Sequence, residues 1–315
     1  MIISASRRTD IPSYYSEWFF NRIREGFVYV RNPVNFHSIS KVPLSPDAVD
    51  GIVFWTKNPA PMLDRLDELK DYPYYFQFTL TAYDSDVELH LPDKEDVLIP
   101  AFQRLADKIG LERVIWRYDP ILINQKYTND YHVEYFEKFA RRLQGYTGKC
   151  TISFIDLYRN TVRNADGLEL SEISAFCQQE LAKALSDIAR RYGLQIDACA
   201  EPADFSQYGI GRARCIDDRL LQRISGYPLK IEKDKNQRLE CGCVSSVDIG
   251  MYNTCKNGCL YCYANYNEKL VQSHWLAHDV GSPLISGQVS EGDVITERKV
   301  ASNRDSQISF FGGLD

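Results

Sequence analysis

Short apolar runs alternate with longer amphipathic segments along the first two thirds of the chain. The segments 14–25, 62–69, 100–109 and 129–143, and a long segment after Ser171, carry apolar residues at helical spacing. The apolar runs between them predict six strands, at residues 1–6, 51–55, 74–80, 113–116, 151–155 and 194–198. Strands that alternate with helices in this way form a parallel sheet covered by helices.

The alternation predicts an α/β fold, namely a partial or complete (β/α) TIM-like barrel. A doubly wound open sheet is the alternative, although no glycine-rich dinucleotide fingerprint follows the first strand. The longest predicted helix places Ile173, Phe176, Leu181, Leu185 and Ile188 on one buried face. We expect residues 1–240 to form the barrel and residues 241–315 to form a cysteine-rich segment packed on the barrel mouth. The stretch 281–306 is rich in Gly, Ser and charge, which predicts a long loop.

Charged side chains follow the predicted strands. In β/α barrels the loops at the carboxyl ends of the strands carry the active site. Paired charges directly after apolar strands suit an anionic or zwitterionic ligand better than they suit a plain surface loop. The candidate catalytic residues at these positions are Arg8, Asp10, Lys57, Arg117, Asp119, Asp156 and Glu201.

Five of the nine cysteines fall within 22 residues, from Cys241 to Cys262. Clustered thiols in a chain without an export signal indicate a metal site rather than a disulfide framework. Cys255, Cys259 and Cys262 have the spacing Cys-x-x-x-Cys-x-Tyr-Cys. Three thiolates at this spacing can hold three irons of a [4Fe–4S] cluster and leave the fourth iron open to a ligand.

This spacing resembles the signature of radical S-adenosylmethionine (SAM) enzymes. The resemblance implies that Cys255, Cys259 and Cys262 bind the cluster, that the open iron binds SAM, and that Tyr261 packs near the adenine. It also implies an electron donor such as ferredoxin or flavodoxin. The substrate, a small molecule or a macromolecule, is not indicated by any motif.

The motif lies after the sixth predicted strand, whereas in most radical SAM enzymes it follows the first. The segment is therefore either an appended lid or part of a circularly permuted barrel. In the permuted arrangement residues 247–252 form the family's first strand and residues 307–313 form its second. Gly312 and Gly313 would then be the cofactor-binding glycines, but Leu314 stands where the family usually has an acidic residue.

The chain as a whole also resembles an uncharacterised bacterial family, domain of unknown function 1848 (DUF1848). The segments that carry this resemblance are 6–12, 54–59, 117–120 and 241–265. They span nearly the full length, and the family supplies no established reaction.

Cys241 and Cys243 flank a single glycine, which is too tight for the usual zinc hook with its gap of two residues. The pair could supply two ligands of a second metal or iron–sulfur site, with Cys199 and Cys215 as the other candidates. Alternatively, one of the two could close the first cluster.

Composition and charge narrow the functional classes. The chain has 315 residues and a net charge of −6, which does not favour a protein that coats nucleic acid. No apolar run reaches the length of a membrane span, and charges follow the short apolar N-terminus, so we expect a cytoplasmic protein. The sequence favours an enzyme of radical SAM type. The alternatives are an iron–sulfur protein without SAM cleavage, for electron transfer or sulfur chemistry, and a zinc-stapled binding protein.

Overall fold

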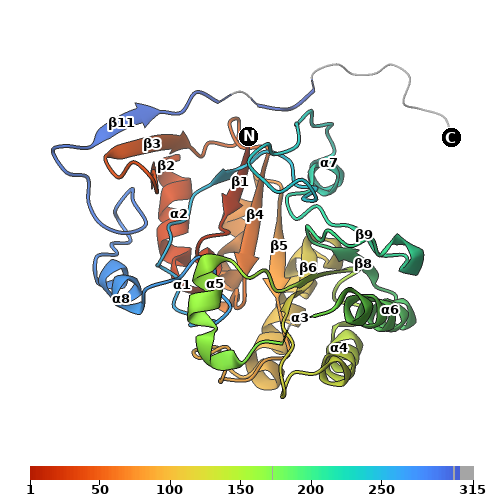
Figure 1. The fold of residues 1–315 in the computed structure, drawn as a ribbon. Coiled ribbons are helices and arrows are strands. Elements are labelled where there is room, and N and C mark those ends of the chain that lie inside the picture. Colours follow the sequence, from red (N-terminus) through yellow and green to blue (C-terminus); the bar gives the residue numbers. More distant parts are fainter. Residues whose placement is uncertain (172, 301, 306–315) are drawn as a thin grey trace, which may run out of the picture.

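A computed structural model describes residues 1–171, 173–300 and 302–305. Its centre is a sheet of eight strands in which every neighbouring pair is parallel (Figure 1). The strand order is β10 (Val247–Asp248), β1 (Ile2–Ala5), β4 (Gly51–Thr56), β5 (Tyr74–Thr79), β6 (Val114–Ile121), β7 (Lys149–Phe154), β8 (Gln195–Ala198) and β9 (Gly211–Arg212). The predicted α/β fold with a parallel sheet is confirmed, and so are all six predicted strands.

Helices connect the strands. The α-helices are α1 (Ile11–Tyr14), α2 (Ser16–Glu25), α3 (Ile99–Ile109), α4 (Asn129–Leu143), α5 (Arg159–Asn164), α6 (Ala175–Arg191), α7 (Asp218–Ser225) and α8 (Glu268–Leu276). The 3-10 helices are η1 (Ala60–Leu69), η3 (Leu111–Arg113), η4 (Asp166–Leu168) and η5 (Ser206–Tyr208), and η2 (Lys94–Leu98) is a π-helix. Local signals set their ends: the Thr128 side chain caps α4, and Gly26 ends α2 in the left-handed conformation. Among the described helices, none is long and apolar enough to cross a membrane.

The longest helix differs from its prediction. Helix α6 is capped by Ser174, so Ile173 lies before the helix. Phe176 is 69% exposed, while Leu181 and Leu185 are buried. At about 100° per residue, Phe176 is rotated away from the face that Leu181 occupies, so its place on the buried face was wrong.

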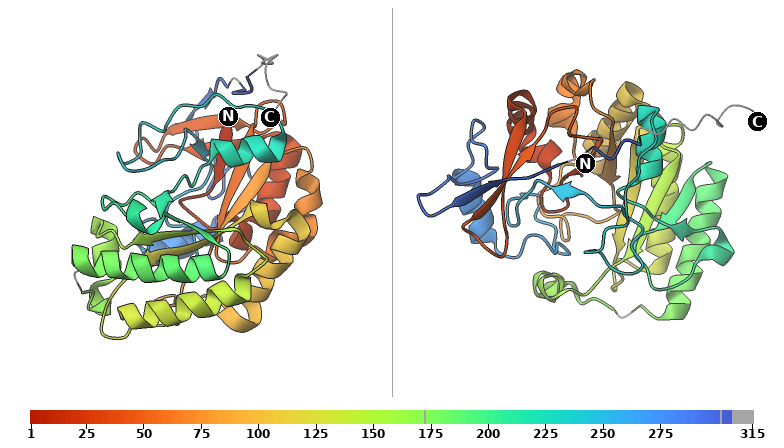
Figure 2. Two further views of the ribbon diagram at one scale, coloured as in Figure 1. Left: turned by 90° about the vertical axis from the view of Figure 1, so that its right-hand side faces the viewer. Right: turned by 90° about the horizontal axis from the view of Figure 1, so that it is seen from above.

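Adjacent residues of β1, β4, β5 and β6 enter different clusters of apolar side chains. Ile3 and Phe76 belong to the main core, together with buried residues of α2, α3, α4 and α6. Ile2 and Tyr75 belong to a second cluster, which contains Leu220 of α7 and several cysteines. Because side chains alternate across a strand, the helices cover one face of the sheet and the 213–244 region covers the other (Figures 1 and 2).

A second, three-stranded sheet stands beside the first. Strands β2 (Phe27–Arg31) and β3 (Ser38–Pro43) are antiparallel, and β11 (Val294–Glu297) pairs with β3 in parallel. The loop predicted for 281–306 was therefore wrong at Val294–Glu297. All four residues of β11 are exposed, so the strand rests on backbone pairing with a distant segment and leaves little hydrophobic pattern in the sequence.

Strand β10 joins the cysteine-rich segment to the main sheet beside β1. The Asp248 carboxylate accepts hydrogen bonds from Ser4 Oγ at 2.8 Å and Ser6 Oγ at 2.7 Å. Gly250 passes so close to β1 that a Cβ there would lie 2.1 Å from Ser6 Oγ. The segment before the three-cysteine motif is thus part of the central sheet. The second strand expected at 307–313, with Gly312 and Gly313, lies outside the described residues.

Candidate functional site

The three-cysteine motif forms a loop over the carboxyl ends of the strands next to β10. Cys259 makes an isolated antiparallel bridge with Glu88, in the loop after β5. The Leu260 amide donates to the Val87 carbonyl at 2.9 Å. The motif is therefore joined by its backbone to a loop that lies about 170 residues earlier in the chain.

Asp10 connects the motif to the ends of β1 and β4. Its Oδ2 atom accepts hydrogen bonds from the Lys57 amide at 2.8 Å and from Asn257 Nδ2 at 3.2 Å. Its Oδ1 atom accepts from the Ser13 amide at 3.1 Å. Burial raises the pKa of Asp10, although these hydrogen bonds oppose the shift. Asp10, a predicted catalytic residue, thus holds together the end of β4, the start of α1 and the cysteine motif.

The motif thiols are free and half-buried. Burial raises the pKa of Cys255 and Cys262, and it raises the pKa of Cys259 to about 12 even though Lys57 opposes the shift. In the described structure, none of these three sulfurs forms a hydrogen bond with another of the three. In the described part of the chain, no three His, Cys, Asp or Glu side chains stand in an arrangement that could hold a metal ion.

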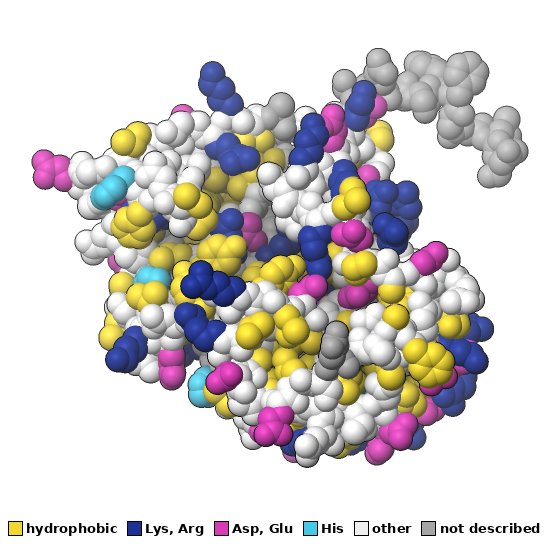
Figure 3. Space-filling model, in the orientation of Figure 1, with side chains coloured by type: hydrophobic (Ala, Val, Ile, Leu, Met, Phe, Trp, Pro, Cys, Tyr) yellow, Lys and Arg dark blue, Asp and Glu magenta, His cyan; other side chains and the backbone are white. Residues whose placement is uncertain are grey.

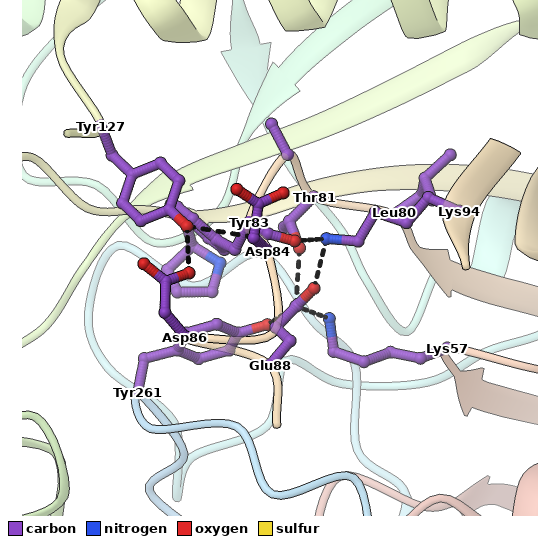
Figure 4. Close-up of polar contacts among 12 residues, drawn as sticks. Lys57, Leu80, Thr81, Tyr83, Asp84, Asp86, Glu88, Lys94, Tyr127 and Tyr261 are labelled. Carbon is purple, nitrogen blue, oxygen red and sulfur yellow. Dashed lines mark hydrogen bonds and ion pairs between the residues drawn. The ribbon is translucent and has the colours of Figure 1, made fainter. Parts of the chain in front are cut away.

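A buried network of charges lies beside Cys259. Lys57 Nζ and Lys94 Nζ each lie 2.6 Å from an oxygen of the Glu88 carboxylate, and Thr81 Oγ1 donates to it at 2.7 Å. Figure 4 shows the two ammonium groups converging on this carboxylate. Burial alone would raise the pKa of Glu88, but the two ammonium groups lower it to about 2. The carboxylate is therefore ionised and fully paired.

Tyr261 of the motif enters the same network. Its hydroxyl donates to Glu88 Oε1, and its ring lies 5.7 Å from the ring of Tyr83. The Lys57 ammonium sits 5.5 Å from the centre of the Tyr261 ring. Sequence reasoning found Lys57 and Tyr261 but missed Glu88 and Lys94. Glu88 lies in a loop and Lys94 begins η2, and no periodicity in the sequence marks the two as a buried pair.

A second group of predicted residues surrounds Arg117. The Arg117 guanidinium pairs with Asp119, which also accepts a hydrogen bond from Ser153. Glu201 accepts from the Phe154 amide at 2.8 Å. Burial raises the pKa of Glu201 to about 7, and the neighbouring carboxylates contribute to the shift. The carboxyl ends of β6, β7 and β8 therefore present one guanidinium and two carboxyl groups.

The other predicted charges lie at the two sides of this row. Arg8 is 3.9 Å from Asp248 and sits over the ring of Tyr252. Asp156 forms a half-exposed ion pair with Arg238 at 2.6 Å. Basic and acidic side chains gather across the middle of the molecule in the space-filling view (Figure 3).

The four remaining candidate ligands lie together on the same face of the sheet. Cys199 Sγ is 3.3 Å from Cys215 Sγ. The amide of Ile216, the residue after Cys215, donates to Cys243 Sγ at 3.3 Å, and Cys241 belongs to the same apolar cluster. Arg117 Nη1 donates to Cys215 Sγ at 2.9 Å. The structure thus gathers the four cysteines into one cluster, in which Arg117 contacts Cys215.

Comparisons with known proteins identify a family and a distant structural likeness. No curated protein matches the chain. A solved structure described as "a putative alpha-L-fucosidase from Bacteroides thetaiotaomicron VPI-5482" is 13% identical, with a TM-score of 0.25 over 57% of this chain and 72% of that one. A likeness this weak carries no functional argument.

The family model for domain of unknown function 1848 matches residues 2–264. This range contains both the strand ends with their charged residues and the complete three-cysteine motif. The match confirms the resemblance found in the sequence, and the chain belongs to the DUF1848 family.

Proposed function

We propose that this protein is an iron–sulfur enzyme of radical SAM type, in which Cys255, Cys259 and Cys262 hold a [4Fe–4S] cluster. The observation that carries the proposal is the position of the motif. The motif follows a strand of the parallel sheet, and Cys259 forms a β-bridge with Glu88 near the carboxyl ends of the parallel strands. In α/β proteins of this kind, ligands bind at the carboxyl ends of the strands.

The donor set suits an iron–sulfur cluster. Cysteine thiolates are the usual ligands of such clusters, and three of them leave one iron available to another ligand. The three sulfurs do not hydrogen-bond one another in the described structure, so they are not already committed to contacts among themselves. When bound, the cluster would supply the electron for reductive cleavage of SAM, and the radical chemistry on the substrate would belong to the cofactors.

The protein's own residues would position these groups and exclude water. The Glu88 network fixes Lys57 and Tyr261 beside Cys259, so a cation and an aromatic ring lie next to the cluster loop. Arg8, Arg117 and Asp156 would receive the charged end of SAM or the substrate, while Tyr261 would lie near the adenine. Glu201, held by the Phe154 amide, would face the substrate.

The sheet favours the permuted arrangement over an appended lid. In a partial (β/α) barrel of permuted order, β10 takes the place of the first strand and the cysteine loop follows it directly. The N-terminal β1 is its neighbour on one side. The charged loop that follows β1 then lies beside the cysteine loop, where Asp10 contacts Asn257.

Anaerobic reconstitution with iron and sulfide tests the proposal. The wild-type protein and Cys177→Ala, a control at the half-exposed thiol of α6, should each gain the colour and about four irons of one cluster at this site. Replacement of Cys255, Cys259 and Cys262 by alanine should abolish both. In the reduced wild-type protein, added SAM should change the electron paramagnetic resonance spectrum and be cleaved.

The outcomes separate the competing functions. A triple variant with the full iron content of the wild type would overturn the cluster assignment. A cluster whose spectrum does not respond to SAM would replace the radical mechanism by electron transfer or sulfur chemistry. If the wild-type protein binds zinc and no iron at these three cysteines, the proposed function would be replaced by that of a zinc-stapled binding protein.

A further inference from the structure

We propose that Cys199, Cys215, Cys241 and Cys243 form a second metal site, which holds a single zinc ion through four thiolates. This site is separate from the three-cysteine motif. The proposal does not depend on the proposed function, because it would hold equally if the motif carried no cluster.

The four cysteines lie in one cluster. Cys199 Sγ is 3.3 Å from Cys215 Sγ, and the amide of Ile216, the next residue along the chain, donates to Cys243 Sγ at 3.3 Å. Cys215, Cys241 and Cys243 are each at most 7% exposed. All four belong to the apolar cluster on one face of the sheet, or pack against it. Four neighbouring thiols from three separate parts of the chain, three of them buried, are more than a core needs, because one cysteine packs as well as a small apolar residue.

The backbone holds these segments in fixed positions. The Cys199 amide continues the ladder after β8 by donating to the Ile152 carbonyl at 2.8 Å. The Cys215 carbonyl accepts from Tyr75 Oη at 2.7 Å and from Gln77 Nε2 at 2.9 Å. Cys199 and Cys215 therefore each belong to a segment that is positioned by hydrogen bonds from the strands.

Glycine is required between the last two cysteines. A Cβ at Gly242 would lie 2.8 Å from the Ala213 carbonyl oxygen and 3.0 Å from Cγ of Arg214. The absence of a side chain thus lets the Cys-Gly-Cys turn approach the segment that carries Cys215. Cys241 and Cys243 both belong to the apolar cluster that contains Cys215, so the tight spacing that rules out the usual zinc hook still places both residues near the other two cysteines.

The sulfur spacing favours one ion over a cluster. Zinc–sulfur bonds of about 2.3 Å in a tetrahedron place the sulfurs about 3.8 Å apart. The Cys199 and Cys215 sulfurs are 3.3 Å apart, so a shift of about half an ångström would bring them to that spacing. An iron–sulfur cluster would instead place iron and sulfide atoms between its cysteine sulfurs. No ready metal arrangement is present among the described side chains, so side-chain rotations must bring the four sulfurs to a tetrahedron.

Two guanidinium groups supply the compensating charge. Four thiolates around a divalent zinc ion leave two negative charges in excess. Arg117 donates to Cys215, and Arg7 interacts electrostatically with Cys215 and Cys243. Both guanidiniums lie over the ring of Trp55, at 4.9 and 5.4 Å from its centre. The Nη2 atom of Arg7 is buried without a hydrogen-bond partner in the described structure, as a donor aimed at a thiolate site would be before the metal is bound.

The zinc ion would link the two edges of the sheet, at β9 and at β10. Cys199 and Cys215 follow β8 and β9 at one end, while Cys243 lies four residues before β10 at the other. A tetrathiolate at this point would fix the chain that enters β10 and thereby the position of the three-cysteine loop.

Metal analysis of the full-length protein, purified from cells grown with added zinc, tests the site. We expect one zinc per chain in the wild type, in Cys177→Ala and in the variant with alanine at Cys255, Cys259 and Cys262. Zinc should be lost in Cys215→Ala and Cys243→Ala. Gly242→Ala keeps every sulfur but displaces the turn, so it should bind zinc at least tenfold more weakly in a chelator competition.

X-ray absorption of the wild-type protein keeps the proposal testable even if these variants fail to fold. Zinc should show four sulfur neighbours at about 2.3 Å. A wild-type protein that contains no zinc and takes up none, a zinc shell with fewer than four sulfurs, or a Cys199–Cys215 disulfide in the purified protein would overturn the proposal. Iron that is lost with Cys215 and Cys243 would overturn it in favour of a second iron–sulfur cluster.

Discussion

Replacing Glu88 with glutamine would leave two buried ammonium groups without the carboxylate that they share. The side chains of Lys57 and Lys94 are 10% and 16% exposed, and that of Glu88 is 1% exposed. Removal of one partner from a buried ion pair typically costs 3–5 kcal/mol, because an uncompensated charge remains. The partial exposure of both lysines lets them turn toward water, so we expect Glu88→Gln to lower the free energy of unfolding by about 3 kcal/mol.

Lys57→Met should cost less, although it removes an equally short hydrogen bond. Lys94 would still neutralise Glu88, and Thr81 and Tyr261 would still donate to its Oε1 atom. The expected loss is that of one hydrogen bond between charged groups, about 1.5–3 kcal/mol. In the double variant the two losses should not add, because each removes part of the same network.

Urea unfolding at pH 7, followed by circular dichroism, measures these differences. Glu68→Gln is the matched control, because Glu68 pairs with Arg65 at 2.6 Å with both side chains about a third exposed. Such an exposed pair contributes between zero and about 1 kcal/mol. The reasoning would be refuted if Glu88→Gln were no more destabilising than this control, or if the Glu88 and Lys57 effects added fully.

Two further predictions concern the fold around the site. His132 is buried, with Nε2 2.8 Å from the Leu122 carbonyl oxygen, and burial lowers its pKa to about 4. The contribution of neutral His132 to the free energy of unfolding is complete above the unfolded pKa of about 6.5. It is lost as the pH falls toward 4, which lowers the free energy of unfolding by about 3 kcal/mol. If the free energy of unfolding of His132→Gln fell equally steeply over this range, the prediction would be contradicted. Gly250→Ala should lower the free energy of unfolding by about 1–3 kcal/mol through the clash with Ser6, and it should lower iron retention. The control Gly167→Ala, whose Cβ meets nothing within 4 Å, should change neither. Unfolding curves and iron assays of both variants check this, and equal behaviour of the two would count against the close approach of β10 to β1.

The local pattern of apolar and polar residues in the sequence predicts most of the architecture. The six predicted strands appear because apolar runs bounded by helical segments have few other ways to bury their side chains. The cap at Thr128 and the stop at Gly26 act within one or two turns, so a local sequence contains them. The spacing of Cys255, Cys259 and Cys262 is likewise local, so the sequence contains the signal for an iron–sulfur cluster without the fold.

Long-range contacts decided the rest of the candidate site. Strand β10 is two residues long and exists because Asp248 meets Ser4 and Ser6, more than 240 residues away. Glu88 looks like any loop acid until tertiary folding places Lys57 and Lys94 on either side of its carboxylate. No periodicity marks such pairs, because each partner lies on a different segment.

The scattered cysteines show the same division between sequence and structure. The sequence by itself determined that Cys199, Cys215, Cys241 and Cys243 were candidate ligands, but not that they lie side by side. Their contacts depend on β8, β9 and the Cys-Gly-Cys turn meeting over one face of the sheet, where Gly242 alone allows the chain to approach Ala213. Residue type and spacing are properties of the sequence, whereas the distance between sulfurs on separate segments is set only when the whole sheet packs.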